Sequence, residues 1–141
     1  MQQTWDHREY KHQFHGITLT EFDTATMRLK PETARTIWMG DDVKLVEGPH
    51  LYKINGWYYL FCAEGGTVWT HQESVARSRT LDELSFEASP TNPFITNFDI
   101  PGSYLQKQGH GALVDTPSGE WYYASLCGRP WHHEPESLTD P

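Results

Sequence analysis

Two segments of the chain share an order of residues that strongly limits the folds it can adopt. Each segment has a leucine, a turn containing glycine, the tripeptide Trp-Tyr-Tyr and then a cysteine. Leu51 and Leu113 are 62 residues apart, and Trp57 and Trp121 are 64 residues apart. A unit repeated at this spacing and built only of strands is typical of a β-propeller blade, although tandem hairpins of a β-sandwich can give the same pattern.

The rest of the chain also favours strands over helices. Residues 14–23 alternate apolar and polar side chains, and residues 73–79 suit a further strand. Asn55-Gly56 is a strong hairpin signal, and the sequence TPSG at 116–119 predicts a second turn. We therefore predict an all-β fold, a partial β-propeller of roughly two blades plus flanking strands.

A propeller needs at least four blades to close, so about two blades are too few for a complete domain. We expect residues 1–141 to be part of a single β-propeller domain that is truncated at both ends. A chain of this kind also buries little core and leaves open sheet edges. A polypeptide that does not fold stably alone is therefore one of the outcomes we consider.

Composition excludes several classes of function. The net charge is -8, which argues against nucleic acid or an anionic membrane as the main partner. No apolar run is long enough for a transmembrane helix, and the polar N-terminus is not a signal peptide, which slightly favours a cytoplasmic location. The oligomeric state is not indicated.

Cys62 and Cys127 each lie in an apolar strand-like run, so we expect both to be buried free thiols.

Four polar residues occupy related places at the ends of the two predicted hairpins. Glu47 and His110 precede the repeated leucines, and Thr67 and Arg129 follow the second strands. If they converge at the mouth of a propeller channel, they suit a polar, hydroxyl-rich ligand. The alternatives are a solvated acid at Glu47, a structural His110 and a surface ion pair at Arg129; the nearby Glu64 could be a turn acid. The glycines that flank His110 allow close approach of the backbone.

Several long motifs occur in one order along the chain. They are FHGITLTEFD, VEGPHLYKINGWYYLFCAEGGT, SVARSRTLDELSFEASPTNPFIT and QKQGHGALVDTPSGEWYYASLCGRP. Together they resemble glycoside hydrolase family 43, most of all its β-xylosidases and the related α-L-arabinofuranosidases. The resemblance implies a five-bladed β-propeller that hydrolyses glycosidic bonds of xylan-derived oligosaccharides with inversion.

The resemblance also implies roles for individual residues. Glu47 matches the general acid of the family, and Thr67, His110 and Arg129 match positions that contact the bound sugar. Glu64 matches a position that only supports the loop carrying Thr67. The resemblance implies no cofactor. Some relatives carry an axial cation such as calcium near the equivalent of His110, but we predict no metal, and we interpret residues 131–134 as a loop.

The chain departs from the family in one respect that matters for catalysis. The family uses an Asp general base and a second Asp that tunes the acid, and neither motif is found in these residues. The general base is therefore expected to be missing from this chain. The alternatives to a glycosidase are a non-catalytic carbohydrate-binding propeller segment and an inactive truncated product.

Overall fold

The computed structural model describes residues 2–5, 14–41, 43–100 and 102–129. Within these ranges all regular structure is β, and no helix there could cross a membrane. The strands are β1 (Gln2–Trp5), β2 (Phe14–Asp23), β3 (Arg28–Trp38), β4 (Glu47–Ile54), β5 (Trp57–Glu64), β6 (Gln72–Ser78), β7 (Glu87–Ala88), β8 (Ile95–Thr96), β9 (Gln106–Asp115) and β10 (Trp121–Gly128).

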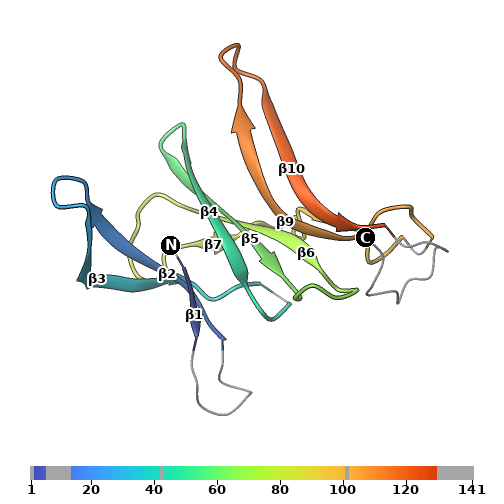
Figure 1. The fold of residues 1–141 in the computed structure, drawn as a ribbon, viewed down its shortest axis with the longest axis horizontal. Coiled ribbons are helices and arrows are strands. Elements are labelled where there is room, and N and C mark those ends of the chain that lie inside the picture. Colours follow the sequence, from blue (N-terminus) through green and yellow to red (C-terminus); the bar gives the residue numbers. More distant parts are fainter. Residues whose placement is uncertain (1, 6–13, 42, 101, 130–141) are drawn as a thin grey trace.

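The strands form three antiparallel sheets. The first has the order β1-β2-β3, the second has the order β4-β5-β6-β7 with β8 also paired to β6, and the third is the hairpin β9-β10. Figure 1 shows them side by side in chain order, with the hairpin turns of β4–β5 and β9–β10 at the top. This arrangement confirms the prediction of an all-β chain made of successive antiparallel sheets.

Both predicted hairpin turns are present. Asn55 and Gly56 have φ angles of 50° and 76°, the pair of positive values that a two-residue type I′ turn requires. At the end of β9, the Gly119 N–H donates to the Thr116 carbonyl at 2.9 Å, and Gly119 has a φ of 91°. The strands predicted at 14–23 and 73–79 correspond to β2 and β6.

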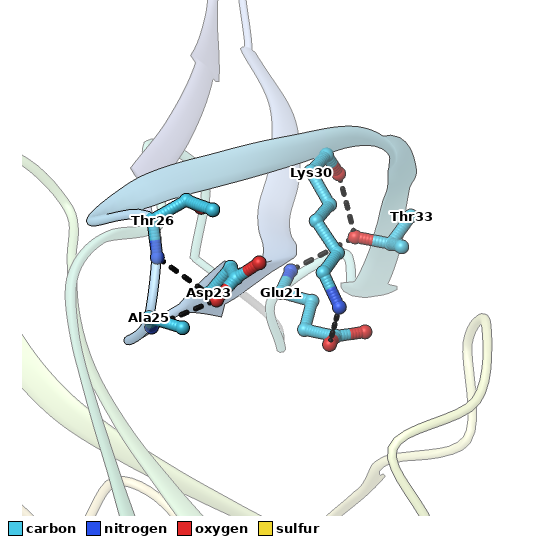
Figure 2. Close-up of polar contacts among 6 residues, drawn as sticks. All are labelled: Glu21, Asp23, Ala25, Thr26, Lys30 and Thr33. Carbon is cyan, nitrogen blue, oxygen red and sulfur yellow. Dashed lines mark hydrogen bonds and ion pairs between the residues drawn. The ribbon is translucent and has the colours of Figure 1, made fainter.

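The turn between β2 and β3 is held by its own side chains (Figure 2). The Asp23 carboxylate accepts hydrogen bonds from the backbone N–H groups of Ala25 and Thr26, at 2.8 and 3.2 Å. These bonds favour the ionised carboxylate and lower the pKa of Asp23. Lys30 forms an ion pair with Glu21 across the same hairpin. The turn is therefore closed locally, without help from the rest of the molecule.

Strand β3 was not predicted from the sequence, and its irregular pairing explains why. Leu19 pairs with Arg35, but Glu21, only two residues further along β2, pairs with Lys30. The excess residues on β3 form a bulge, and Pro31 lies in it. Proline is tolerated in strands mainly at edges and bulges, so a strand that contains one lacks the usual alternating signal.

The main core lies between the first two sheets. Its buried members come from β2, β3, β5, β6 and the segments beside β4 and β7; they are Ile17, Ile37, Trp38, Val46, Leu60, Cys62, Ala76 and Phe86. Cys62 is buried as predicted, but the prediction that Cys127 is buried is wrong. Cys127 lies on β10, which pairs only with β9 among the described strands, so that fewer neighbours cover it.

The other face of the second sheet meets β9 and β10 through an aromatic seam, made of Tyr52, Phe61, Phe94 and Tyr123. Successive rings meet edge to face, with centroids 5.7, 5.3 and 5.1 Å apart. This geometry is the favoured one for aromatic pairs. The Tyr52 hydroxyl also accepts a hydrogen bond from the Leu113 N–H of β9 at 2.8 Å. The seam and this hydrogen bond thus hold the β9–β10 hairpin against β4 and β5.

Candidate functional site

Glu47 is half-buried at the first position of β4, paired with Ala63 of β5. The next residue, Gly48, has a φ of 58°, and the pairing of β4 with β5 shifts between Glu47 and His50. A Cβ atom at Gly48 would lie only 2.5 Å from Nε2 of His110. The His110 imidazole therefore occupies the space of a missing side chain directly beside Glu47.

His110 lies within β9, not before it, because the strand begins already at Gln106. Its φ is 51°, a left-handed value that is uncommon for a residue other than glycine. On one side, a Cβ at Gly109 would lie 2.7 Å from the Gln72 carbonyl oxygen of β6. The glycine thus permits the close backbone approach that the sequence suggested, and it brings His110 to the second sheet.

The internal repeat extends to the backbone of these segments. At the spacing of 62 residues seen for the leucines, Leu45 corresponds to Lys107 and Gly48 to His110. All four have positive φ angles, of 69° and 55° for the first pair and 58° and 51° for the second. The two hairpins therefore begin with the same pair of left-handed kinks. In the space between them, glycine in one hairpin makes room for histidine in the other.

Thr67 and Arg129 lie further from this pair. Thr67 is exposed in the loop after β5, and Arg129 is exposed just after β10. Both lie at the open ends of their hairpins, as predicted, but no hydrogen bond or ion pair among the described residues joins either to Glu47 or His110. Their contact with a sugar stays a prediction. A cleft of about 240 Å³ lies away from these residues and is lined by Tyr59, Val75, Ala76, Arg77, Ser89 and Pro90.

Glu64 is not a solvated turn acid. Its side chain is fully buried, and its Oε1 accepts a hydrogen bond from the Asp41 N–H at 2.6 Å. Burial raises the pKa of Glu64, although the Asp41 N–H acts in the opposite direction. Beyond Glu64, the Gly65 N–H donates to the Lys44 carbonyl at 2.8 Å, which ties the loop that leads to Thr67 to the segment before β4.

Two buried titratable residues near Glu47 were missed by the sequence analysis. Glu73 on β6 is fully buried, and its Oε2 accepts the Gly111 N–H at 3.0 Å. His71 is 1 % exposed, and its Nδ1 lies 2.9 Å from the Lys107 carbonyl oxygen. For Glu73 the available signal was an acid at the start of a predicted strand, which is more often a residue of the solvent face.

The electrostatics confirm that these groups lie close together. Burial lowers the pKa of His71, a positive His110 lowers it further, and the Glu47 carboxylate opposes both. Burial raises the pKa of Glu73 to about 7, while the backbone N–H of Gly111 acts in the opposite direction. His71 is thus within electrostatic reach of both His110 and Glu47.

The described residues do not assemble a group of three or more His, Cys, Asp or Glu side chains that could hold a metal ion. His110 is thus a single candidate donor there. The segment 131–134, interpreted above as a loop, lies outside the described residues. The absence of a metal stays a prediction.

Comparison with known proteins gives a consistent picture. The model of the family "Glycosyl hydrolases family 43" matches residues 1–140. The chain is 44% identical to the Beta-xylosidase of Bacillus subtilis (strain 168) over 136 residues, which are 95% of this chain and 25% of that protein. It is 48% identical to the Xylosidase/arabinosidase 43B of Humicola insolens over 126 residues, which are 89% of this chain and 23% of that protein.

Among solved structures, the xylan beta-1,4-xylosidase from Bacillus halodurans C-125 matches with a TM-score of 0.87 and 44% sequence identity. The match covers 96% of this chain and 25% of that one. The chain thus spans about a quarter of the length of the relatives that it matches. The fold is a partial five-bladed β-propeller, as the sequence predicted.

Proposed function

This chain belongs to glycosyl hydrolase family 43, and from that premise we propose that it supplies the general acid of an inverting glycosidase. The substrates are oligosaccharides derived from xylan, cleaved as β-xylosides or α-L-arabinofuranosides. The observation that carries the proposal is the position of Glu47, half-buried at the start of β4 with the His110 imidazole beside it. Relatives that share 44 to 48% of its residues are named xylosidase or xylosidase/arabinosidase.

In this proposal Glu47 gives its proton to the glycosidic oxygen as the bond to the sugar breaks. An acid in this role must be protonated before the reaction. An inverting enzyme also needs a carboxylate on the other side of the sugar, about 6.5–9.5 Å away, to activate water. No residue of this chain is assigned to that general base.

The proposal gives the other candidate residues roles in binding. His110 lies beside Glu47 and offers a ring nitrogen to the sugar, and Thr67 and Arg129 offer a hydroxyl and a guanidinium from the open ends of the two hairpins. Hydroxyl groups of a sugar both donate and accept hydrogen bonds, so a mixed set of this kind is suited to them.

The test is the Glu47→Gln variant of the complete gene product that contains these residues. On aryl xylosides with poor leaving groups, kcat should fall by roughly 10²–10⁴, because such groups depend most on protonation. With good leaving groups the loss should be much smaller. The matched control is Glu87→Gln on β7, an exposed glutamate that should leave kcat unchanged.

Equal activity of Glu47→Gln and wild type on every leaving group would show that Glu47 is not the acid. A carbohydrate-binding segment without catalysis gives a third result. In that case, titration calorimetry shows heat with xylobiose, but no aryl xyloside is hydrolysed by the wild-type protein.

A further inference from the structure

Glu73 lies in the same row of the second sheet as Glu47. Glu47 pairs with Ala63, and Ala63 pairs with Glu73 on the next strand. Residues that pair directly across a sheet share a face, and neighbouring strands are about 4.8 Å apart, so the two backbones are separated by about 10 Å. Both carboxyl side chains therefore face the side of the sheet on which β9 lies.

Glu73 holds β9 at the residue after His110. Its Oε2 accepts the Gly111 N–H at 3.0 Å, while on the other side of His110 the backbone of Gly109 rests on Gln72. These contacts fix β9 to β6 on both sides of His110. The left-handed φ of 51° at His110 is strained for a histidine, and such a conformation persists only where its surroundings enforce it.

The consequence of this backbone conformation is the position of the imidazole. The His110 ring lies over Gly48, where a Cβ would be 2.5 Å from its Nε2, and Gly48 follows Glu47 directly. A chain of direct contacts thus runs from Glu73 through the Gly111 N–H and His110 to Gly48, the residue that follows Glu47. None of the other described acids makes a hydrogen bond to this segment of β9.

We propose that Glu73 is a positioning residue for the general acid, because it holds the His110 turn of β9 against Gly48, the residue that follows Glu47. This inference rests on the proposed role of Glu47. Glu73 does not touch the substrate in it. Without the hydrogen bond from the Gly111 N–H to Glu73, β9 loses one of its two anchors beside His110, and the start of β4 that carries Glu47 loses the ring packed against it.

Burial raises the pKa of Glu73 to about 7, so the strength with which its carboxyl group accepts the Gly111 N–H changes near neutral pH. Other groups that influence this pKa come from the neighbouring strands. Glu64 on β5 raises its pKa, and the Tyr123 hydroxyl on β10 and the backbone N–H of His110 on β9 lower it. Cys62 of β5 also lies close enough for the Glu73 carboxylate to raise the pKa of its thiol.

Three variants of the complete gene product test whether Glu73 positions His110 for catalysis or only stabilises the fold. Glu73→Gln keeps an oxygen that can accept the Gly111 N–H but removes the charge, and Glu73→Ala removes both. The matched control is Tyr52→Phe, which deletes the acceptor of the Leu113 N–H, another hydrogen bond from the second sheet to β9. At pH 4.5, where the folded protein keeps Glu73 neutral, all three should lower the Tm by a few degrees.

Only the Glu73 variants should change the chemistry. We expect Glu73→Gln to lower kcat on aryl xylosides roughly tenfold, a part of the general-acid contribution, with KM within about twofold. Glu73→Ala should lose more, and the pH profile of kcat should lose its dependence on a group near pH 7. In NMR spectra, the ring signals of His110 should shift in Glu73→Ala and stay in place in Tyr52→Phe, because Glu73 holds the backbone next to His110.

The NMR comparison is independent of the proposed function. If the complete gene product hydrolysed no xyloside, the His110 ring signals would still decide whether Glu73 holds the ring in place. Unchanged His110 signals in Glu73→Ala, with kcat equal to that of Tyr52→Phe, would overturn the inference. Should Glu73→Ala not fold, Glu73→Gln decides: kcat and His110 signals equal to those of Tyr52→Phe would overturn the inference.

Discussion

The two repeated hairpins, β4–β5 and β9–β10, share the tripeptide Trp-Tyr-Tyr and a turn that contains glycine, but different segments surround them. On β5 the last five residues, 60–64, are buried. On β10, Trp121 and Tyr122 are 47% and 58% exposed, and Cys127 is exposed where its counterpart Cys62 is fully buried. Similar sequence therefore gives the same local structure but opposite burial.

The difference comes from the neighbours of each hairpin. β5 lies between β4 and β6, with the first sheet on one face and β9 on the other. β10 pairs with β9 and with no other described strand. A hairpin is specified by its turn and by its alternation, whereas burial depends on segments distant in the sequence.

The largest effect should come from truncating one leucine in each hairpin. Leu60 on β5 is fully buried, and Leu126 on β10 is 60% exposed. Leu60→Ala should lower the free energy of unfolding by about 2–5 kcal/mol, because it leaves a cavity in the core. Leu126→Ala should change it by less than about 0.5 kcal/mol. Urea denaturation of both variants measures the contrast, and equal losses would mean that the hairpins are equally buried.

A smaller and pH-dependent effect is expected from Glu73 on β6, which joins the second sheet to β9. Because it is buried, the folded protein holds its proton up to about pH 7, but the unfolded chain releases it near the usual value of 4.5. The unfolded state binds fewer protons between these values, so the contribution of Glu73 to stability falls as the pH rises from 4.5 to 7. The decline is on the order of 3 kcal/mol.

Glu73→Gln should remove this decline. Unfolding measured in urea at pH 4.5 and pH 8 gives the difference in stability for wild type and for the variant, and the variant should lose less on going to pH 8. Glu120→Gln is the control, because Glu120 is exposed and its pKa is lowered by the Ser118 and Thr116 hydroxyls. A decline of equal size in wild type and Glu73→Gln would contradict the prediction.

The smallest change in stability is expected from substitution of a cysteine. The reactivity of Cys62 on β5 and Cys127 on β10 toward a thiol reagent compares the burial of the two hairpins. In native protein Cys127 should react with a thiol reagent, while Cys62 should react only on unfolding, because burial and the Glu73 and Glu64 carboxylates raise the pKa of its thiol. Cys127→Ser should abolish the native reaction and change stability by less than about 0.5 kcal/mol. Native labelling that persists in Cys127→Ser would place Cys62 in reach of solvent.

Features of the fold that depend on local chemistry could be predicted from the sequence. Asn55-Gly56 needs only its own φ preferences to form a turn, and β2 and β6 show their alternation directly. β3 could not be predicted, because its bulge and Pro31 interrupt the pattern that identifies a strand. The exposure of Cys127 could not be predicted either, since it depends on which strands lie beside β10.

The candidate site divides in the same way. The glycines around His110 indicated a close backbone approach, and the structure shows it at Gly109. The His110 ring packs on Gly48, which is 62 residues away in the sequence. This contact is seen only in the folded structure, where β9 lies against the second sheet. Glu73 was missed for a physical reason: a buried acid and a solvated acid look alike in a strand until its hydrogen-bond donor, here Gly111, is known.

The fit of the His110 ring over Gly48 also limits how these positions can vary during evolution or design. Residue 48 must lack a side chain as long as residue 110 is large, so any substitution at Gly48 alone should be rejected in a selection for folded protein. Both positions require left-handed backbone, which restricts replacements mainly to glycine, asparagine and aspartate. Positions 48 and 110 should therefore change as a pair, and a mutational library should sample them jointly.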